Sequence, residues 1–213
     1  MGAVSGGPVT GAPIRIILAD DQALVRGGLA ALLALEPDIE VVAEVGRGDE
    51  LADAVARLAP DVCVVDIEMP GGDGITATGR IREAHPHVRV LIVTTFGRPG
   101  YVSRALEAGA GGFLVKDTPA RELAEAVRRV NAGETVVDAQ LARESMAAGP
   151  DPLTPREKDV LREALTGARI ADIAAELHLT QGTVRNHLSS AIAKTHTSTR
   201  GEAAREAQVR GWL

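Results

Sequence analysis

The chain has 213 residues, of which 45% are hydrophobic, 24% are charged and 2% are aromatic, and its net charge is −6. This composition excludes a disordered chain and predicts a soluble globular protein with a core of Ala, Val, Leu and Ile. The single cysteine, Cys63, excludes an intramolecular disulfide and no apolar run has the length of a membrane span, so we expect a cytoplasmic protein with no membrane partner.

The two ends of the chain differ in character. Residues 1–13 lack a basic start followed by an apolar block, so they are predicted to be a flexible N-terminal tail and not a signal peptide. Residues 151–213 carry nine basic and eight acidic side chains, whereas the preceding residues carry fourteen and twenty-one. This uneven charge favours an acidic domain joined to a mildly basic one with a different partner, although chance alone could produce it.

Short apolar runs alternate with longer segments of helical period over residues 14–132. The apolar runs are residues 14–20, 39–45, 62–66, 88–95 and 111–116, and the helical segments are residues 22–35, 49–58, 74–84, 99–108 and 119–132. Nearly continuous apolar strands that alternate with helices are typical of a parallel sheet covered on both faces. We therefore predict an α/β domain with a doubly wound, five-stranded, flavodoxin-like parallel sheet.

Residues 133–152 are predicted to be a linker that holds one weak helix. A small all-α domain is predicted over residues 153–213, because the pattern there is purely helical. It begins with Thr154 as an N-cap and Glu157 three residues later, which is the pattern of a capping box. Further helices are predicted at residues 170–177, 181–194 and 201–209.

Polar side chains follow four of the predicted strands. Asp20 and Asp21 follow the first strand, Asp66 the third, Thr94 the fourth and Lys116 the fifth. Ligands of parallel α/β sheets bind at the carboxyl ends of the strands, and clustered carboxylate oxygens suit Mg²⁺. Any one of these residues could simply cap its strand, but five of them in this order favour a binding site.

These residues resemble the receiver domain of bacterial two-component response regulators. The resemblance covers about residues 14–132 and rests on "ADD", "DIEMPGGDG", "TT" and "FLVKD". It implies that a sensor histidine kinase phosphorylates Asp66. It also implies that Mg²⁺ is held by Asp20, Asp21, Asp66 and the backbone carbonyl of Glu68, that Thr94 and Lys116 bind the phosphoryl oxygens, and that Phe113 is the switch aromatic. The chain departs from the pattern at Gly72, where a larger residue is common.

Residues 170–195 have the form of a helix-turn-helix. "HLT" makes the turn, and Thr180 caps the second helix. Arg185, Asn186 and Ser189 fall on the face opposite the apolar stripe, where Arg can read guanine and Asn can read adenine. Thr183 and Lys194 are better placed for phosphates. The alternative is a small helical bundle with an ordinary polar face.

The C-terminal run resembles the LuxR-type domain of the NarL/FixJ response regulators over about residues 152–213. The motifs are "LTPREKDVL", "IADIAAELHLTQGTVRNHL" and "AREAQVRGWL". The resemblance implies that helix 181–194 reads double-stranded DNA and that helix 201–209 contributes a dimer contact. The implied DNA-binding residues are Thr180, Gln181, Thr183, Arg185, Asn186, Ser189 and Lys194. Because residues 195–200 carry less positive charge than is usual, we expect modest affinity.

Together these features predict a two-component response regulator. Phosphorylation of Asp66 is expected to promote formation of a homodimer that binds promoter DNA and regulates transcription, and the chain is not expected to be an enzyme. Two alternatives remain at this point: a regulator that binds DNA without phosphorylation, and an aspartyl-phosphate hydrolase that uses Asp66 as its nucleophile.

Overall fold

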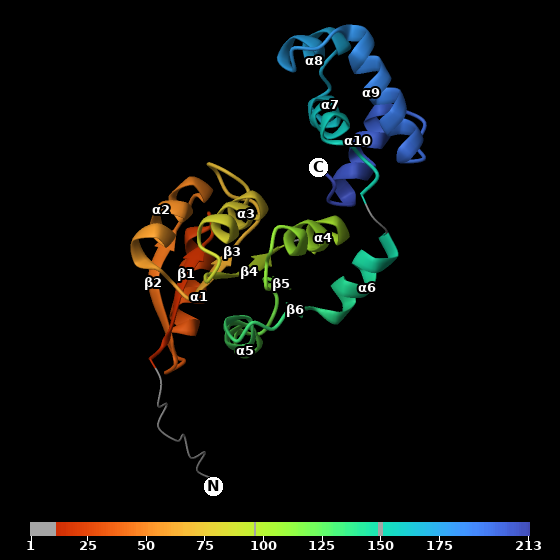
Figure 1. Cartoon of the computed structure of the whole chain (residues 1–213). Coiled ribbons are helices and arrows are strands. Elements are labelled where there is room, and N and C mark those ends of the chain that lie inside the picture. Colours follow the sequence, from red (N-terminus) through yellow and green to blue (C-terminus); the bar gives the residue numbers. More distant parts are fainter. Residues whose placement is uncertain (1–11, 96, 149–150) are drawn as a thin grey trace. The chain divides into compact units, whose positions relative to one another are not determined.

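The computed structural model of the chain describes residues 12–95, 97–148 and 151–213. Most of the predicted N-terminal tail and the Gly149–Pro150 step of the predicted linker lie outside these residues. The chain forms two compact units (Figure 1). The first runs to Gly97 and resumes at Arg104–Ala139, and the second comprises Arg98–Ser103 and Gln140–Leu213.

The first unit is built on a parallel sheet in the order β2-β1-β3-β4-β5-β6. The strands are β1 Ile14–Ala19, β2 Ile39–Val45, β3 Val62–Val65, β4 Arg89–Thr94, β5 Gly112–Val115 and β6 Val136–Val137. The predicted doubly wound parallel sheet is confirmed, but the prediction of five strands was wrong by one. The additional strand β6 lies in the segment predicted to be a linker. Its two residues are too few to show a periodic pattern.

Helices cover both faces of this sheet. They are α1 Ala23–Leu33, α2 Gly48–Leu58, α3 Gly74–Ala84 and α5 Ala120–Asn131, whereas α4, Pro99–Glu107, is divided between the two units. Helices α1 and α5 pack on one face over a core of aliphatic strand residues that includes Leu18, Val64 and Leu91. Strand residues that alternate with these, such as Ile17 and Ile92, are fully buried as well, as expected for a sheet with two covered faces.

After β6 the described chain is helical. The helices are α6 Ala139–Ala148, α7 Pro155–Leu165, α8 Ile170–Glu176, α9 Gln181–Lys194 and α10 Arg200–Val209. The predicted capping box at Thr154 is present, and the Thr180 side chain accepts a hydrogen bond from the backbone N–H of Thr183 at 3.1 Å. Aliphatic side chains from α7 to α10 enclose a core together with Trp212. None of the helices in the described ranges combines the length and hydropathy needed to cross a bilayer.

Cys63 lies in the middle of β3 and is completely buried. Burial raises the pKa of its thiol to about 12, because the thiolate would have to form in apolar surroundings. The side chain therefore acts as a small hydrophobic residue of the sheet and not as a nucleophile.

Candidate phosphoacceptor site and nucleic-acid interface

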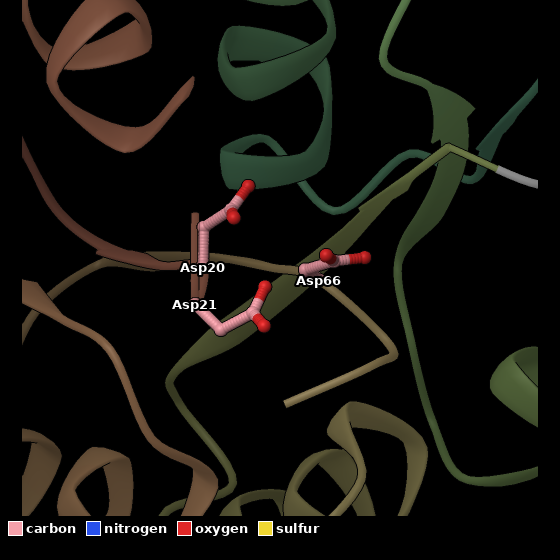
Figure 2. Close-up of side chains that lie close together, drawn as sticks. All are labelled: Asp20, Asp21 and Asp66. Atoms are coloured by element: carbon pink, nitrogen blue, oxygen red, sulfur yellow. The ribbon is translucent and has the colours of Figure 1, made fainter. Parts of the chain in front are cut away.

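Three carboxylates meet at the carboxyl edge of the sheet (Figure 2). Asp20 and Asp21 directly follow β1, and Asp66 directly follows the neighbouring strand β3. One carboxylate oxygen from each of the three lies within 4.8 Å of the others. Asp20 and Asp66 are only 3% and 4% exposed, whereas Asp21 is exposed to solvent. The predicted cluster is therefore assembled, with one solvent-facing member.

Backbone hydrogen bonds fix the two buried carboxylates. The backbone N–H of Asp66 donates to the Ala19 carbonyl at 2.8 Å, which extends the β1–β3 pairing to the acidic residue. Asp66 Oδ1 accepts from the N–H of Ile67 at 2.7 Å, and Asp20 Oδ1 accepts from the N–H of Gln22 at 2.8 Å. Each carboxylate thus uses one oxygen to hold its position and leaves Oδ2 for the site.

Lys116 occupies the space between these two free oxygens. Its Nζ lies 2.7 Å from Asp20 Oδ2 and 2.8 Å from Asp66 Oδ2. Burial alone would lower the pKa of Lys116, but the hydrogen bonds to Asp20 and Asp66 raise it above its ordinary value. Lys116 is therefore charged at neutral pH and compensates part of the negative charge of the cluster.

A cavity of about 290 Å³ opens beside the carboxylates. It is lined by Asp21, Gln22, Asp66, Glu68, Thr94 and Thr95. Thr94, at the end of β4, is 2% exposed, and Phe113 in β5 is fully buried in the core. Hard oxygen donors beside a small polar cavity fit Mg²⁺, which keeps part of its water shell and favours phosphate oxygens. The donor set therefore suits the cation that the sequence predicted.

Close backbone contacts that only glycine permits hold the loop between β3 and α3 in position. The backbone N–H of Gly48, at the start of α2, donates to the Pro70 carbonyl at 3.0 Å. A Cβ atom on Gly48 would lie 2.2 Å from the Gly72 carbonyl oxygen, and one on Gly74 would lie 2.0 Å from the Asp66 carbonyl oxygen. These contacts hold the loop that carries Glu68 against α2 and the end of β3.

Arg26 in α1 contacts the backbone of the site, and this contact was not predicted from the sequence. Its guanidinium donates to the backbone carbonyl of Asp20, and its Nε lies 3.5 Å from the Glu44 carboxylate on β2. Arg26 falls within the helical segment predicted over residues 22–35, but no pattern in the sequence indicated that its side chain folds back toward β1. Gln22 and Thr95 were also missed as cavity-lining residues because loop conformation determines their positions.

Helix α9 has an exposed polar face in the second unit. Gln181, Arg185, Asn186 and Ser189 are exposed on it, as expected for side chains that reach into a DNA groove. Thr183 is partly buried, and Thr180 is used as the N-cap. The DNA contacts of all these residues stay predictions.

Lys194, at the end of α9, makes an ion pair inside the domain, although the sequence had suggested a contact with DNA phosphates. Its Nζ lies 2.8 Å and 3.0 Å from the two carboxylate oxygens of Glu157 in α7. Glu157 is 3% exposed, so this pair joins two helices inside the domain. The pattern "LTPRE" predicted Glu157 as part of a capping box but not its ion pair, because the partner lies 37 residues further along the chain.

Comparisons with known proteins define the class of the two domains. Residues 16–128 match the response regulator receiver domain, and residues 151–207 match the family described as bacterial regulatory proteins, luxR family. The chain therefore belongs to the response regulators that join a receiver domain to a LuxR-type DNA-binding domain.

Individual relatives resemble the chain over nearly its full length. The uncharacterized transcriptional regulatory protein YvfU of Bacillus subtilis is 42% identical, covering 94% of this chain and all of the relative. The transcriptional regulatory protein DesR of the same organism is 41% identical over 94% of this chain and 99% of its own length. Among solved structures, the response regulator ChrA of a heme-sensing two-component system is 33% identical with a TM-score of 0.57, covering 95% of this chain and 100% of that chain.

Proposed function

We propose that this protein is a cytoplasmic transcription regulator controlled by phosphorylation of Asp66. A sensor histidine kinase supplies the phosphoryl group, Asp20, Asp21, Asp66 and the Glu68 carbonyl hold Mg²⁺, and the phosphorylated receiver forms a homodimer. The observation that carries this proposal is the position of the buried Asp66 carboxylate, which lines a polar cavity between a second acidic group and Lys116.

The chemistry follows from these positions. A carboxylate oxygen of Asp66 attacks the phosphorus of a phosphohistidine, the P–O bond forms as the P–N bond breaks, and the imidazole leaves with a proton from solvent. Phosphoryl transfer depends mainly on positioning and charge neutralisation, and bound Mg²⁺ would neutralise phosphoryl oxygens. Lys116 would exchange its contact with Asp66 for one with a phosphoryl oxygen, and the Thr94 hydroxyl would donate to another. The chain turns over no other substrate beyond slow hydrolysis of its own acyl phosphate.

The added charge provides the signal. A phosphoryl group carries roughly 1.5 to 2 negative charges at pH 7. Movement of Thr94 toward this charge would draw Phe113 with it and change the surface near α4 and α5. A complete switch from about 1:99 to 99:1 needs roughly 5.5 kcal/mol of differential stabilisation, which the new charge-assisted contacts and subunit association would share.

The output is sequence-specific binding to double-stranded promoter DNA. Helix α9 would enter the major groove with Gln181, Arg185, Asn186 and Ser189 toward the bases. Thr180 and Thr183 would lie near the phosphates. A dimer would engage half-sites about one helical turn apart, roughly 34 Å.

The test is treatment with acetyl phosphate and Mg²⁺ on the wild type and on Asp66→Asn. We expect a phosphoryl mass gain that hydroxylamine removes, together with a dimer in sedimentation experiments, for the wild type alone. Thr95→Val provides a matched change at the cavity rim that keeps Asp66. Equal sedimentation and DNA binding by wild type and Asp66→Asn would instead support a regulator that works without phosphorylation.

A further inference from the structure

Glu157 is a buried carboxylate that serves two helices at once. It is 3% exposed and stands in the first turn of α7. Its Oε2 accepts from the backbone N–H of Thr154 at 2.7 Å, and the Thr154 hydroxyl accepts from the Glu157 N–H at 3.3 Å. This reciprocal capping box fixes the carboxylate close to the helix N-terminus.

The same carboxylate accepts hydrogen bonds from two side chains in the C-terminal half of α9. Ser190 Oγ donates to Glu157 Oε1 at 2.6 Å, and Lys194 Nζ approaches Oε1 and Oε2 at 3.0 Å and 2.8 Å. Ser190 and Lys194 are four residues apart, so they lie on one face of the helix. Both carboxylate oxygens therefore have a partner on α9 and Oε2 has one in the cap as well.

The anchored face of α9 differs from the face proposed for DNA. At about 100° per residue, Ser190 lies roughly 140° around the helix from Arg185. Val184, Leu188 and Ala191 occupy the remaining side of the helix and are buried in the domain core, whereas Ser189 and Asn186 lie on the arc between Arg185 and Ser190. Aliphatic contacts of this kind tolerate small rotations, whereas hydrogen bonds with fixed donors and acceptors limit the rotation much more strictly.

We propose that Glu157 is a positioning residue for DNA recognition: with Ser190 and Lys194 it fixes the rotation of α9, and Lys194 acts inside the domain and not on a DNA phosphate. This inference rests on the proposed DNA-binding function of α9. It reassigns the one basic residue of the helix that the sequence placed near the phosphate backbone. Arg185 is then the basic residue of α9 that faces the DNA.

Lys194 could either pair with Glu157 inside the domain or contact a DNA phosphate, and these two roles predict a different effect of its removal on the salt dependence of DNA binding. Each neutralised phosphate adds about 0.9 to the slope of log K against log salt. The experiment uses the full-length wild-type protein, treated with acetyl phosphate and Mg²⁺, to select duplexes from a random-sequence pool. Binding of the variants, treated in the same way, to a selected duplex and to a scrambled one is then measured at several salt concentrations. Fluorescence of Trp212, the single tryptophan, identifies a temperature at which each variant remains folded.

For Lys194→Met we expect the wild-type slope, about tenfold weaker binding to the selected duplex, and a smaller ratio of selected to scrambled binding. Arg185→Met should lose more of the selected-to-scrambled ratio than Lys194→Met, because it removes an exposed side chain that is proposed to contact the bases. The double variant Glu157→Gln/Lys194→Met should bind better than Lys194→Met alone, since the buried carboxylate no longer lacks its partner.

Ser190→Ala provides a milder change if Lys194→Met does not fold, since it removes one hydrogen bond and keeps the ion pair. We expect this variant to lose a few-fold of the selected-to-scrambled ratio at an unchanged slope. A flatter slope for Lys194→Met, an unchanged ratio for Ser190→Ala, or strictly additive effects in the double variant would overturn the proposal. Failure of the wild type to select any sequence would refute the proposed DNA-binding function itself.

Discussion

Lys116 reaches across the carboxyl edge of the sheet to Asp66, with its Nζ 2.8 Å from Asp66 Oδ2. It makes a second contact of 2.7 Å with Asp20, so a single ammonium group neutralises part of a cluster of three carboxylates. The lysine and a divalent cation therefore compensate the same negative charge. Removal of the lysine is therefore expected to change Mg²⁺ affinity and phosphoryl transfer in opposite directions.

Replacing Lys116 with Met should strengthen Mg²⁺ binding several-fold and at the same time reduce phosphorylation by acetyl phosphate. The carboxylates lose their internal counter-ion, so they attract the cation more strongly, whereas the phosphoryl group loses a positive partner. Isothermal titration calorimetry with Mg²⁺ and mass spectrometry of the treated protein would measure the two effects. Lys158→Met, which removes a lysine paired with Asp151 at 2.6 Å in the other unit, serves as the control. Weaker Mg²⁺ binding in Lys116→Met would contradict this account.

Gly48→Ala should destabilise the receiver unit by about 1–3 kcal/mol, because the new methyl group would overlap the Gly72 carbonyl. It should also weaken Mg²⁺ binding, since the displaced loop carries Glu68. Gly79→Ala in α3 is the matched control, because nothing lies within 4 Å of its Cβ position. That change should stabilise the helix by about 0.5–1 kcal/mol. Thermal unfolding with and without Mg²⁺ distinguishes the two, and equal shifts for both variants would refute the steric argument.

Acid should weaken the DNA-binding unit through Glu157. Burial alone would raise the pKa of this carboxyl, but hydrogen bonds from Lys194, Ser190 and Thr154 lower it to about 2. The folded value lies below the unfolded value of about 4.3, so the contribution to stability is complete above that pH and is lost as the pH falls toward 2.

The measurement is unfolding by denaturant, followed by Trp212 fluorescence, at a series of pH values between neutrality and pH 2. Glu157→Gln should be less stable than wild type at neutral pH and less sensitive to acid over the lower part of the series. Glu176→Gln, which changes an exposed carboxylate, should retain the acid sensitivity of the wild type. The same acid sensitivity in Glu157→Gln and wild type would show that another carboxylate is responsible.

Thr94→Val should allow Asp66 to be phosphorylated but reduce the formation of the dimer. Valine has nearly the shape of threonine, so this buried position at the end of β4 stays filled, but no hydroxyl remains to bind the phosphoryl group. Sedimentation after acetyl phosphate treatment measures the effect, with Thr95→Val as the neighbouring control. Full dimerisation of Thr94→Val would remove Thr94 from the switch.

Much of the architecture could be predicted because its causes are local. The alternation of apolar runs and helical segments predicted strands β1 to β5 and the helices between them, and Thr154 and Thr180 predicted two helix starts. Strand β6 could not be predicted in this way, since Val136 and Val137 become a strand only by pairing with β5. Its existence depends on the completed sheet and not on its own sequence pattern.

The acidic site was also predictable, since strand ends in a parallel sheet share one edge and Asp20, Asp21, Asp66, Thr94 and Lys116 all stand at such ends. Contacts that depend on side-chain direction were not predictable. Arg26 folds back onto the Asp20 carbonyl, and Lys194 turns inward to Glu157. In both cases the sequence predicts the helix. It does not predict whether the long side chain extends into solvent or bends back to a polar group of the protein.

The complete burial of Cys63 has a practical consequence. Its thiol stays protonated and out of reach of reagents, so a cysteine introduced at an exposed position would be the only readily alkylated one in the folded protein. A spin label or fluorophore could then be attached at one chosen point, for example on α9 or on α1, without first removing the native residue. Distance measurements between labels on two copies of the protein would then follow formation of the homodimer directly as acetyl phosphate is added.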